Sequence, residues 1–373
     1  MHIVIDAHLA VKQIDGVARY LNGLLTELPK VDPAIRYTIL SLPSEASSLP
    51  EAIFANPNVQ RVEINVDGLS PRQHLMMRGL LQELQADLYH HPQFDLPVGI
   101  GVPSVVTIHD LKYLAHPQFL KKKSRLKSLY IKKSLQHSLK AARQIIAVSK
   151  NTLHDLEKLF SFDKEKVSVI HHGVRKSSRR RADDKIVPPG MMANDFVLFV
   201  GTRRPHKNLV GLIEACHILR NRYRLAVDLV VAGKAYADYS EPEKTVRDLG
   251  MESHTHFLDF VPDRDLTALY RSARVVALVS FFEGFGLPLL EAMSYGTPVI
   301  GSNTTSIPEV IGDAGLLANP DDPNDIAQKI YQIISDEATA QKLSRAGLQR
   351  CKQFTWKSVA KSTLNVYNKA LSS

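Results

Sequence analysis

The sequence predicts an α/β protein with two doubly wound domains, and three observations support this fold class. The chain has 373 residues, which is too long for one ordinary hydrophobic core. Short apolar runs alternate with amphipathic helical segments in two blocks, as expected for helices that cover parallel sheets. A basic stretch without periodicity over 175–185 ends near Pro188 and separates the blocks. We therefore place the first domain at 1–178 and the second at 186–355.

The expected strands follow one another at spacings that leave room for helices between several of them. In the first block they are 2–6, 37–40, 59–64, 87–90, 104–108, 144–148 and 166–170. In the second block they are 196–201, 227–232, 255–260, 275–280, 297–301 and 315–318. A last helical pattern begins at Trp356. Parallel sheets built this way bind ligands at the carboxyl ends of their strands.

Composition indicates a reducing compartment. The chain has only Cys216 and Cys351, and two separate cysteines do not make a disulfide framework. Residues 1–7 resemble a first strand more than a signal peptide. No apolar run approaches the roughly 20 residues that span a bilayer. We expect a cytoplasmic protein, either soluble or peripheral at the inner face of a membrane.

The segment 121–143 holds nine lysines and arginines and no acidic residue. Its nine positive charges equal the net charge of the whole chain, +9. Interleaved apolar residues favour a helix, although they do not form one clean stripe. Two interpretations stay open. The segment binds an anionic membrane surface, at about 1 kcal/mol per basic residue, or it is a solvated basic face. We expect no nucleic-acid partner, because no aromatic-rich platform accompanies the charge.

The stretch 282–293 places two carboxylates, Glu283 and Glu291, eight residues apart around a glycine-rich turn. It follows the expected strand 275–280, so the turn lies at a carboxyl end. Gly286 lets the backbone approach a ligand, Pro288 suits the first helical position, and Glu291 falls in the first turn. A helix start favours phosphate, and two glutamates favour hydroxyl groups. A plain strand-to-helix turn, with a glutamate stabilised by the helix dipole, is the alternative.

The whole pattern decides between these interpretations. The sequence FEGFGLPLLEAM, followed by 296–300 and by the Pro-Glu-Val run at 308–310, resembles the family 4 retaining glycosyltransferases of GT-B fold. The resemblance implies two Rossmann-like domains facing across a cleft. It implies that the first domain binds the acceptor and that the second binds the nucleotide sugar. It also implies that the C-terminal helix, 356–373, crosses back to the first domain.

A second loop, 201–208, follows the first strand of the second block and suits a diphosphate, because cations and a helix start meet there. In the family an Arg directly follows the glycine and a Lys stands before the next Asn or Gly. Lys207 matches the Lys, whereas Thr202 occupies the Arg position and Arg203 is the nearest substitute. In the first domain, family members have paired glycines where this chain has Asp15 and then Gly16.

The resemblance assigns further contacts. His109, at the tip of the expected strand 104–108, contacts the donor sugar, and the backbone at Phe260 and Val261 holds the base. A His-Asp pair by itself is more often structural. The expected catalytic residues are Glu283, His109 and Lys207. The expected substrate-binding residues are Gly16, Arg203, Phe260, Val261, Phe285, Gly286, Leu287 and Glu291.

The expected function is transfer, with retention, of a hexose to a glycan or lipid-linked glycan in surface polysaccharide synthesis. The resemblance is to bacterial O-antigen and capsule mannosyltransferases, so mannose and GDP-mannose are favoured. No metal or other cofactor is expected, since the histidines lack a metal-ligand spacing.

Two alternatives stay open. One is a UDP-sugar-dependent enzyme of the same family, because backbone contacts to the base leave no side-chain signature. The other is a non-catalytic sugar-nucleotide-binding scaffold, which the departures at Thr202 and Asp15 keep open. A nucleotide-sugar epimerase is not expected to carry FEGFGLPLLEAM, and a glycogen phosphorylase needs a pyridoxal-bearing lysine and a much longer chain.

Overall fold

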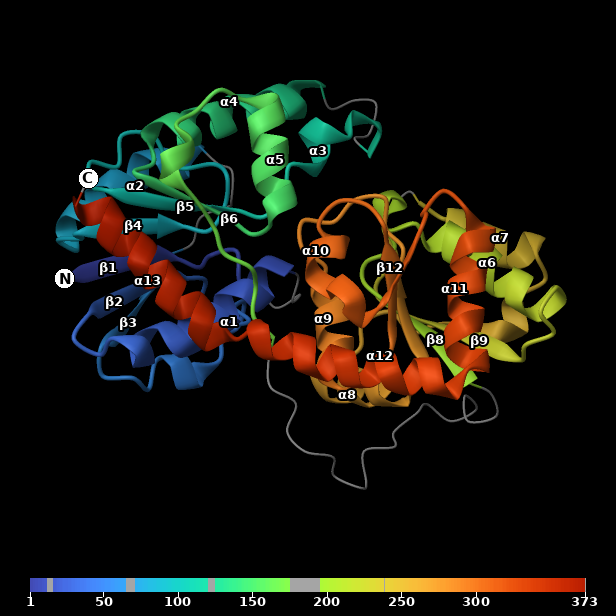
Figure 1. Cartoon of the computed structure of the whole chain (residues 1–373). Helices are drawn as coiled ribbons and strands as arrows, with labels where there is room; N and C mark the ends of the chain where they lie inside the picture. The colour runs from blue at the N-terminus through green and yellow to red at the C-terminus, as the bar shows by residue number, and fades with distance from the viewer. Residues whose placement is uncertain (12–15, 65–70, 120–124, 175–194, 238, 373) are drawn as a thin grey trace. The chain divides into compact units, whose positions relative to one another are not determined.

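The computed structural model describes residues 1–11, 16–64, 71–119, 125–174, 195–237 and 239–372 (Figure 1). The expected interdomain stretch, Asp15 and Lys121 to Lys123 lie outside these residues. The chain divides into two compact units, Met1–Gly173 with Phe354–Ser373, and Val174–Gln353. Cys216 and Cys351 are buried and free.

The first unit is a parallel sheet with helices on both faces. Its strands lie in the order β3-β2-β1-β4-β5-β6-β7 among the described residues. They are β1 (His2–Asp6), β2 (Arg36–Ser41), β3 (Val59–Glu63), β4 (Leu88–His91), β5 (Ser104–Ile108), β6 (Gln144–Ala147) and β7 (Val167–Val169). The helices are α1 (Gly16–Val31), α2 (Pro71–Glu83), α3 (Lys112–Ala115), α4 (Arg125–Ala141), α5 (Lys150–Leu159) and α13 (Trp356–Ser372), with short 3-10 turns η1 (Glu51–Ile53), η2 (Pro117–Phe119) and η3 (Lys164–Lys166).

Alternation along β1 explains why both faces of this sheet are covered. Ile3 and Ile5 belong to one buried cluster with residues of α1 and α13. Val4 belongs to another with residues of α2 and α4. Successive side chains of a strand point to opposite faces, so apolar neighbours require a helix layer on each side. The helix α13, red in Figure 1, packs beside α1 and against β4, β5 and β6.

The second unit repeats this architecture. Its described strands lie in the order β10-β9-β8-β11-β12-β13 and are all parallel. They are β8 (Asp195–Val200), β9 (Val227–Ala232), β10 (Thr255–Phe257), β11 (Val275–Leu278), β12 (Val299–Ser302) and β13 (Leu316–Ala318). The helices are α6 (Leu209–Asn221), α7 (Glu241–Asp248), α8 (Asp263–Ser272), α9 (Leu287–Ser294), α10 (Ile307–Ile311), α11 (Pro323–Ser335) and α12 (Glu337–Arg350), with 3-10 turns η4 (Pro205–Lys207), η5 (Glu252–His254), η6 (Gly312–Ala314) and η7 (Cys351–Gln353).

The predicted fold class is confirmed, since both units are parallel sheets covered by helices. Each sheet also contains a point where the strand order reverses. In the first unit β1 lies between β2 and β4, and in the second β8 lies between β9 and β11. The reversal lies between β1 and β4 in the first sheet and between β8 and β11 in the second. At such a point the loops after the two neighbouring strands lead to opposite faces of the sheet, which leaves room for a ligand at the carboxyl ends of the strands.

Candidate functional site

The strand-order reversal of the second unit holds a largely buried ion pair. Lys207 ends the loop after β8, and Glu283 lies in the loop after β11. The Lys207 ammonium donates to Oε1 of Glu283 at 2.6 Å and to Oε2 at 2.9 Å. The two side chains are 18% and 10% exposed. Sequence analysis named both residues, and the fold brings them together across β8 and β11, which are neighbours in the sheet.

Several hydroxyl groups hold Glu283 in place. Ser280 Oγ donates to its carboxylate at 2.7 Å. The Glu283 backbone N–H donates to Thr305 Oγ1 at 3.2 Å, and Ser306 Oγ donates to the Glu283 carbonyl oxygen at 3.0 Å. Thr305 has a φ of 54°, which is strained for a β-branched residue by about 1–3 kcal/mol. The loop after β12 is therefore strained where it fixes the backbone of Glu283.

Asn208 was not proposed as a site residue from the sequence, yet it joins the two loops. It has a φ of 53° and caps α6, accepting from the Gly211 N–H at 3.3 Å. Its side-chain amide donates to the carbonyls of Val279 at 3.0 Å and Pro320 at 2.7 Å. The signal available in the sequence was an Asn directly before a helical pattern, which is typical of a cap. Its position next to Lys207 makes it a support for that cation.

The helix α9 begins one residue earlier than expected. Gly286 has a φ of 103°, so the first helical residue is Leu287. Pro288 therefore lies at the second helical position, and Glu291 is the fifth residue, beyond the first turn. Both expectations were wrong by one position, because Gly286 adopts the left-handed conformation and caps a helix that already starts at Leu287. Glu291 accepts a hydrogen bond from Tyr270 Oη at 2.8 Å, which orients its carboxylate.

Arg203 lies on the β9 side of its loop. Its side chain is 6% exposed. The guanidinium donates to Gly233 O at 3.1 Å, to Glu243 Oε1 at 2.5 Å and to the Asp259 carboxylate, and it stacks over Phe257. These partners hold the ends of β8, β9 and β10 together. A contact between Arg203 and a diphosphate stays a prediction.

The expected base contacts lie after β10. The strand ends at Phe257 and not at residue 260, because Asp259 turns back to form a bridge with Gly233. Phe260 is 56% exposed, and the Lys234 ammonium lies 5.7 Å from its ring. Val261 is half-buried. An exposed aromatic ring is suited to a planar ligand, and the base contact stays a prediction.

Phe285 and Leu287 flank Gly286 and are buried, at 4% and 8% exposure. Their side chains pack into the second unit, so any ligand contact comes from their backbone N–H groups. Such groups at a helix start favour anions. The start of α9 thus adds donors near the loop that carries Glu283.

The remaining expected residues, Gly16 and His109, belong to the first unit. Gly16 is the exposed first residue of α1. His109 follows β5, and its Nε2 lies 3.2 Å from Pro92 O. The His109 ring stacks on His172 at 5.5 Å and meets Tyr20 edge-on at 5.0 Å. Burial lowers the pKa of His172 well below its usual value, and His109 beside it adds to this effect.

The described residues contain no group of three or more His, Cys, Asp or Glu side chains able to hold a metal ion. Among the same residues, no helix is both long enough and apolar enough to cross a bilayer.

Comparisons with known proteins agree with this geometry. Residues 14–177 match the family described as Glycosyltransferase Family 4, and residues 187–350 match Glycosyl transferases group 1. The O-antigen chain mannosyltransferase B of Escherichia coli is 33% identical over 291 residues, which are 77% of this chain and 75% of that protein. The O-antigen chain mannosyltransferase RfbU of Salmonella typhimurium is 31% identical over 61% of this chain and 60% of its own length.

Among solved structures, Anabaena HepE in complex with UDP and glucose has a TM-score of 0.77 at 19% identity, and the match covers 99% of both chains. The doubly wound units and this likeness define a GT-B fold. The chain belongs to the family 4 glycosyltransferases.

Proposed function

We propose that this glycosyltransferase is a metal-independent, retaining mannosyltransferase that uses GDP-mannose to extend a surface polysaccharide. The observation that carries the proposal is the Lys207–Glu283 pair at the strand-order reversal. Both of the relatives described above are named O-antigen chain mannosyltransferases, which supports mannose as the sugar. The acceptor in this proposal is a glycan or a lipid-linked glycan.

In the proposed donor complex, Lys207 and the N–H groups at the start of α9 bind the diphosphate. When the sugar leaves, negative charge grows on the phosphate oxygens, and donors fixed in advance stabilise that charge. Glu283 accepts hydrogen bonds from hydroxyl groups of the donor sugar, and Glu291 accepts them from the ribose. Lys207 and the amides take the charge-neutralising role that a metal ion has in other transferases.

Retention is proposed because the residues of the family motif are present at Glu283 and Glu291. In this mechanism the acceptor attacks from the face that the nucleotide diphosphate leaves. The departing phosphate oxygen then lies near the acceptor hydroxyl and receives its proton. No base from the second unit is required for that transfer.

A UDP-sugar donor is the second candidate, because Anabaena HepE was solved with UDP and glucose. The backbone at Phe260 and Val261 does not distinguish the bases by side-chain chemistry. Calorimetric titration with GDP-mannose, UDP-glucose and UDP-N-acetylglucosamine tests the choice. We expect GDP-mannose to bind, and Lys207→Ala and Glu291→Ala to weaken it. Binding of a UDP-sugar alone would reverse the assignment of donor, and binding of none would favour the scaffold hypothesis.

We also propose that α4 binds an anionic membrane surface, where a lipid-linked acceptor resides. Leu126 is 83% and Leu129 49% exposed on this helix, and Lys132 and Lys133 are exposed beside them. Exposed leucines among lysines combine apolar and electrostatic attraction to such a surface.

Sedimentation with phosphatidylglycerol vesicles tests the membrane proposal. We expect Lys132→Glu/Lys133→Glu to lose binding, because each lysine contributes about 1 kcal/mol at an anionic surface. The matched control is Lys342→Glu/Lys352→Glu, which changes two exposed lysines of the second unit. Equal loss in both double variants, or equal binding to phosphatidylcholine vesicles, would contradict a specific role for α4.

A further inference from the structure

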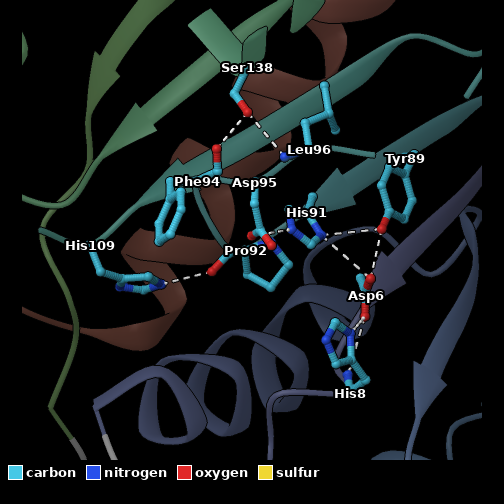
Figure 2. A network of polar contacts seen from close by, with 10 residues as sticks. All are labelled: Asp6, His8, Tyr89, His91, Pro92, Phe94, Asp95, Leu96, His109 and Ser138. Atoms are coloured by element: carbon cyan, nitrogen blue, oxygen red, sulfur yellow. Dashed lines mark hydrogen bonds and ion pairs between the residues drawn. The ribbon is translucent and has the colours of Figure 1, made fainter. Parts of the chain in front are cut away.

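A buried polar network lies at the strand-order reversal of the first unit (Figure 2). Asp6 ends β1 and accepts from four groups. The backbone N–H of His8 lies 3.2 Å from Oδ1, and His8 Nδ1 donates to the same oxygen. The Tyr89 hydroxyl donates to Oδ2 at 2.7 Å, and His91 Nδ1 lies 3.4 Å from it. With both oxygens engaged, this carboxylate is fixed.

His91 continues the network away from β1. Its Nε2 lies 3.1 Å from Asp95 Oδ1, so the ring bridges two carboxylates. Burial alone would lower the pKa of His91, but the hydrogen bonds to Asp6 and Asp95 raise it to about 9. Burial would likewise raise the pKa of Asp6, but His8 and His91 hold it well below its usual value. At neutral pH the bridge is an imidazolium between two carboxylates.

His8 presents a nitrogen that the network does not use. The ring is 4% exposed, and its Nε2 is buried without a hydrogen-bond partner among the described residues. In the neutral ring, the carboxylate at Nδ1 selects the tautomer that has its proton on Nδ1 and its lone pair on Nε2. A buried acceptor left unpaired costs about 1–3 kcal/mol. Such an atom at a ligand-binding edge indicates that a bound group supplies the missing donor.

A second unpaired group lies at the same edge of the sheet. Ser41 ends β2, is 0% exposed, and its hydroxyl has no partner within the described part of the chain. The strand register pairs Asp6 with Leu40, the residue before Ser41. The Ala7 N–H then donates to Leu40 O at 2.7 Å. The ends of β1 and β2 therefore bring His8 and Ser41 to one edge.

The charge of the network argues for a neutral ligand. With a neutral His8 ring, the ion pairs among the described residues set the carboxylates of Asp6 and Asp95 against one imidazolium, that of His91. A phosphate would be repelled by that excess of negative charge, whereas sugar hydroxyls donate to nitrogen and oxygen acceptors without a charge. The donor diphosphate requires the opposite kind of surface, such as the one around Lys207.

We propose that the edge formed by the ends of β1 and β2 binds hydroxyl groups of the sugar acceptor, and that His8 Nε2 accepts a hydrogen bond from one of them. Asp6 and His91 are positioning residues that hold the His8 ring. This inference rests on the proposed function, because it takes a sugar as the acceptor.

Kinetics of transfer from GDP-mannose to methyl α-D-mannopyranoside test the role of His8. In the variant His8→Asn the side-chain amide N–H can still donate to Asp6, but no atom takes the place of Nε2. We expect it to raise KM for the methyl mannoside about tenfold, the loss of one hydrogen bond. The calorimetric affinity for GDP-mannose stays unchanged. The control is Thr363→Val, which removes another buried unpaired hydroxyl on α13 and leaves both quantities unchanged. An unchanged KM in His8→Asn overturns the proposal.

Nitrogen-15 resonances of the histidine rings give an answer that depends neither on transfer nor on a change at His8. We expect methyl α-D-mannopyranoside alone to shift the His8 Nε2 resonance of the wild-type protein and of Thr363→Val. An unmoved resonance at saturating sugar overturns the proposal. If GDP-mannose neither binds nor is consumed while the resonance still moves, the proposed donor is wrong and the sugar site stands.

Discussion

Replacing Lys207 by Met separates two roles of the ion pair in the second unit. The change leaves the Glu283 carboxylate 10% exposed with Ser280 as its remaining described side-chain donor. Removing one partner of a fully buried pair costs about 3–5 kcal/mol. Partial exposure of both side chains lowers this to about 2 kcal/mol. For a unit of this size that corresponds to a fall in Tm of about 4–8 °C.

A double-mutant cycle with Glu283→Gln measures the pair directly. We expect Lys207→Met/Glu283→Gln to recover about 1–2 kcal/mol relative to Lys207→Met, because no charge is then left unpaired. GDP-mannose affinity should not recover. It should stay roughly 10–100-fold below that of the wild type, since a charge-assisted contact to phosphate is lost.

Scanning calorimetry and titration of the same preparations provide both readouts. The control variant is Lys329→Met, which breaks a half-buried pair with Asp325 at 3.9 Å and should cost less than about 1 kcal/mol. A coupling energy below about 0.5 kcal/mol would refute the stabilising role of the pair. Recovery of GDP-mannose affinity in the double variant would refute the role of Lys207 as a phosphate ligand.

Three further predictions follow from the described contacts. Gly233→Ala should destabilise the second unit by about 1–3 kcal/mol in calorimetry, because the added Cβ would lie 1.9 Å from Gly201 O. Glu291→Gln should weaken GDP-mannose about tenfold in titration, the loss of a charged acceptor for ribose hydroxyls. Thermal stability of the first unit should be greatest near pH 6.5. The pKa of His91 is raised from 6.5 to about 9, so the stability that its charged form contributes is lost as the pH rises from 6.5 to about 9. The pKa of His90 is lowered from 6.5 to about 3, so stability is lost as the pH falls from 6.5 to about 3 and the unfolded chain binds a proton there.

Each of these predictions has a matched control. Gly79→Ala adds a Cβ with no heavy atom within 4 Å and should stabilise α2 by up to about 1 kcal/mol. Glu291→Gln keeps an oxygen that accepts from Tyr270, so its Tm should stay close to that of the wild type. His91→Gln should abolish the loss of stability at alkaline pH. An alkaline loss that survives in this variant would show that another group causes it.

Much of the fold followed from apolar periodicity, because each strand is a short buried run. The predicted strand 104–108 matches β5, whereas 275–280 ends early, at Leu278. Ser280 is buried because it hydrogen-bonds to Glu283. Its burial therefore belongs to the site and does not indicate a strand of the sheet. Periodicity does not distinguish these two causes of burial.

The site was only partly predictable. Lys207 and Glu283 belong to a recognisable motif, and the strand order brings them together. The partners of Arg203 lie 40 and 56 residues away along the chain, and local sequence does not reveal them. Asp6 and His91 were missed for a similar reason. Each follows an apolar run, but only the adjacency of β1 and β4 turns them into a network.

The division of the chain has a consequence for synthesis on the ribosome. The first unit consists of Met1–Gly173 and Phe354–Ser373, so its last helix is translated after the whole second unit. At roughly 5–20 residues synthesised per second, the surface that α13 covers stays uncovered for on the order of ten seconds or more. Tyr367 and Val366 of α13 are buried in that surface, and the Tyr367 hydroxyl lies 2.7 Å from His90 Nδ1. The nascent first unit therefore exposes an apolar surface to chaperones until the second unit has been synthesised.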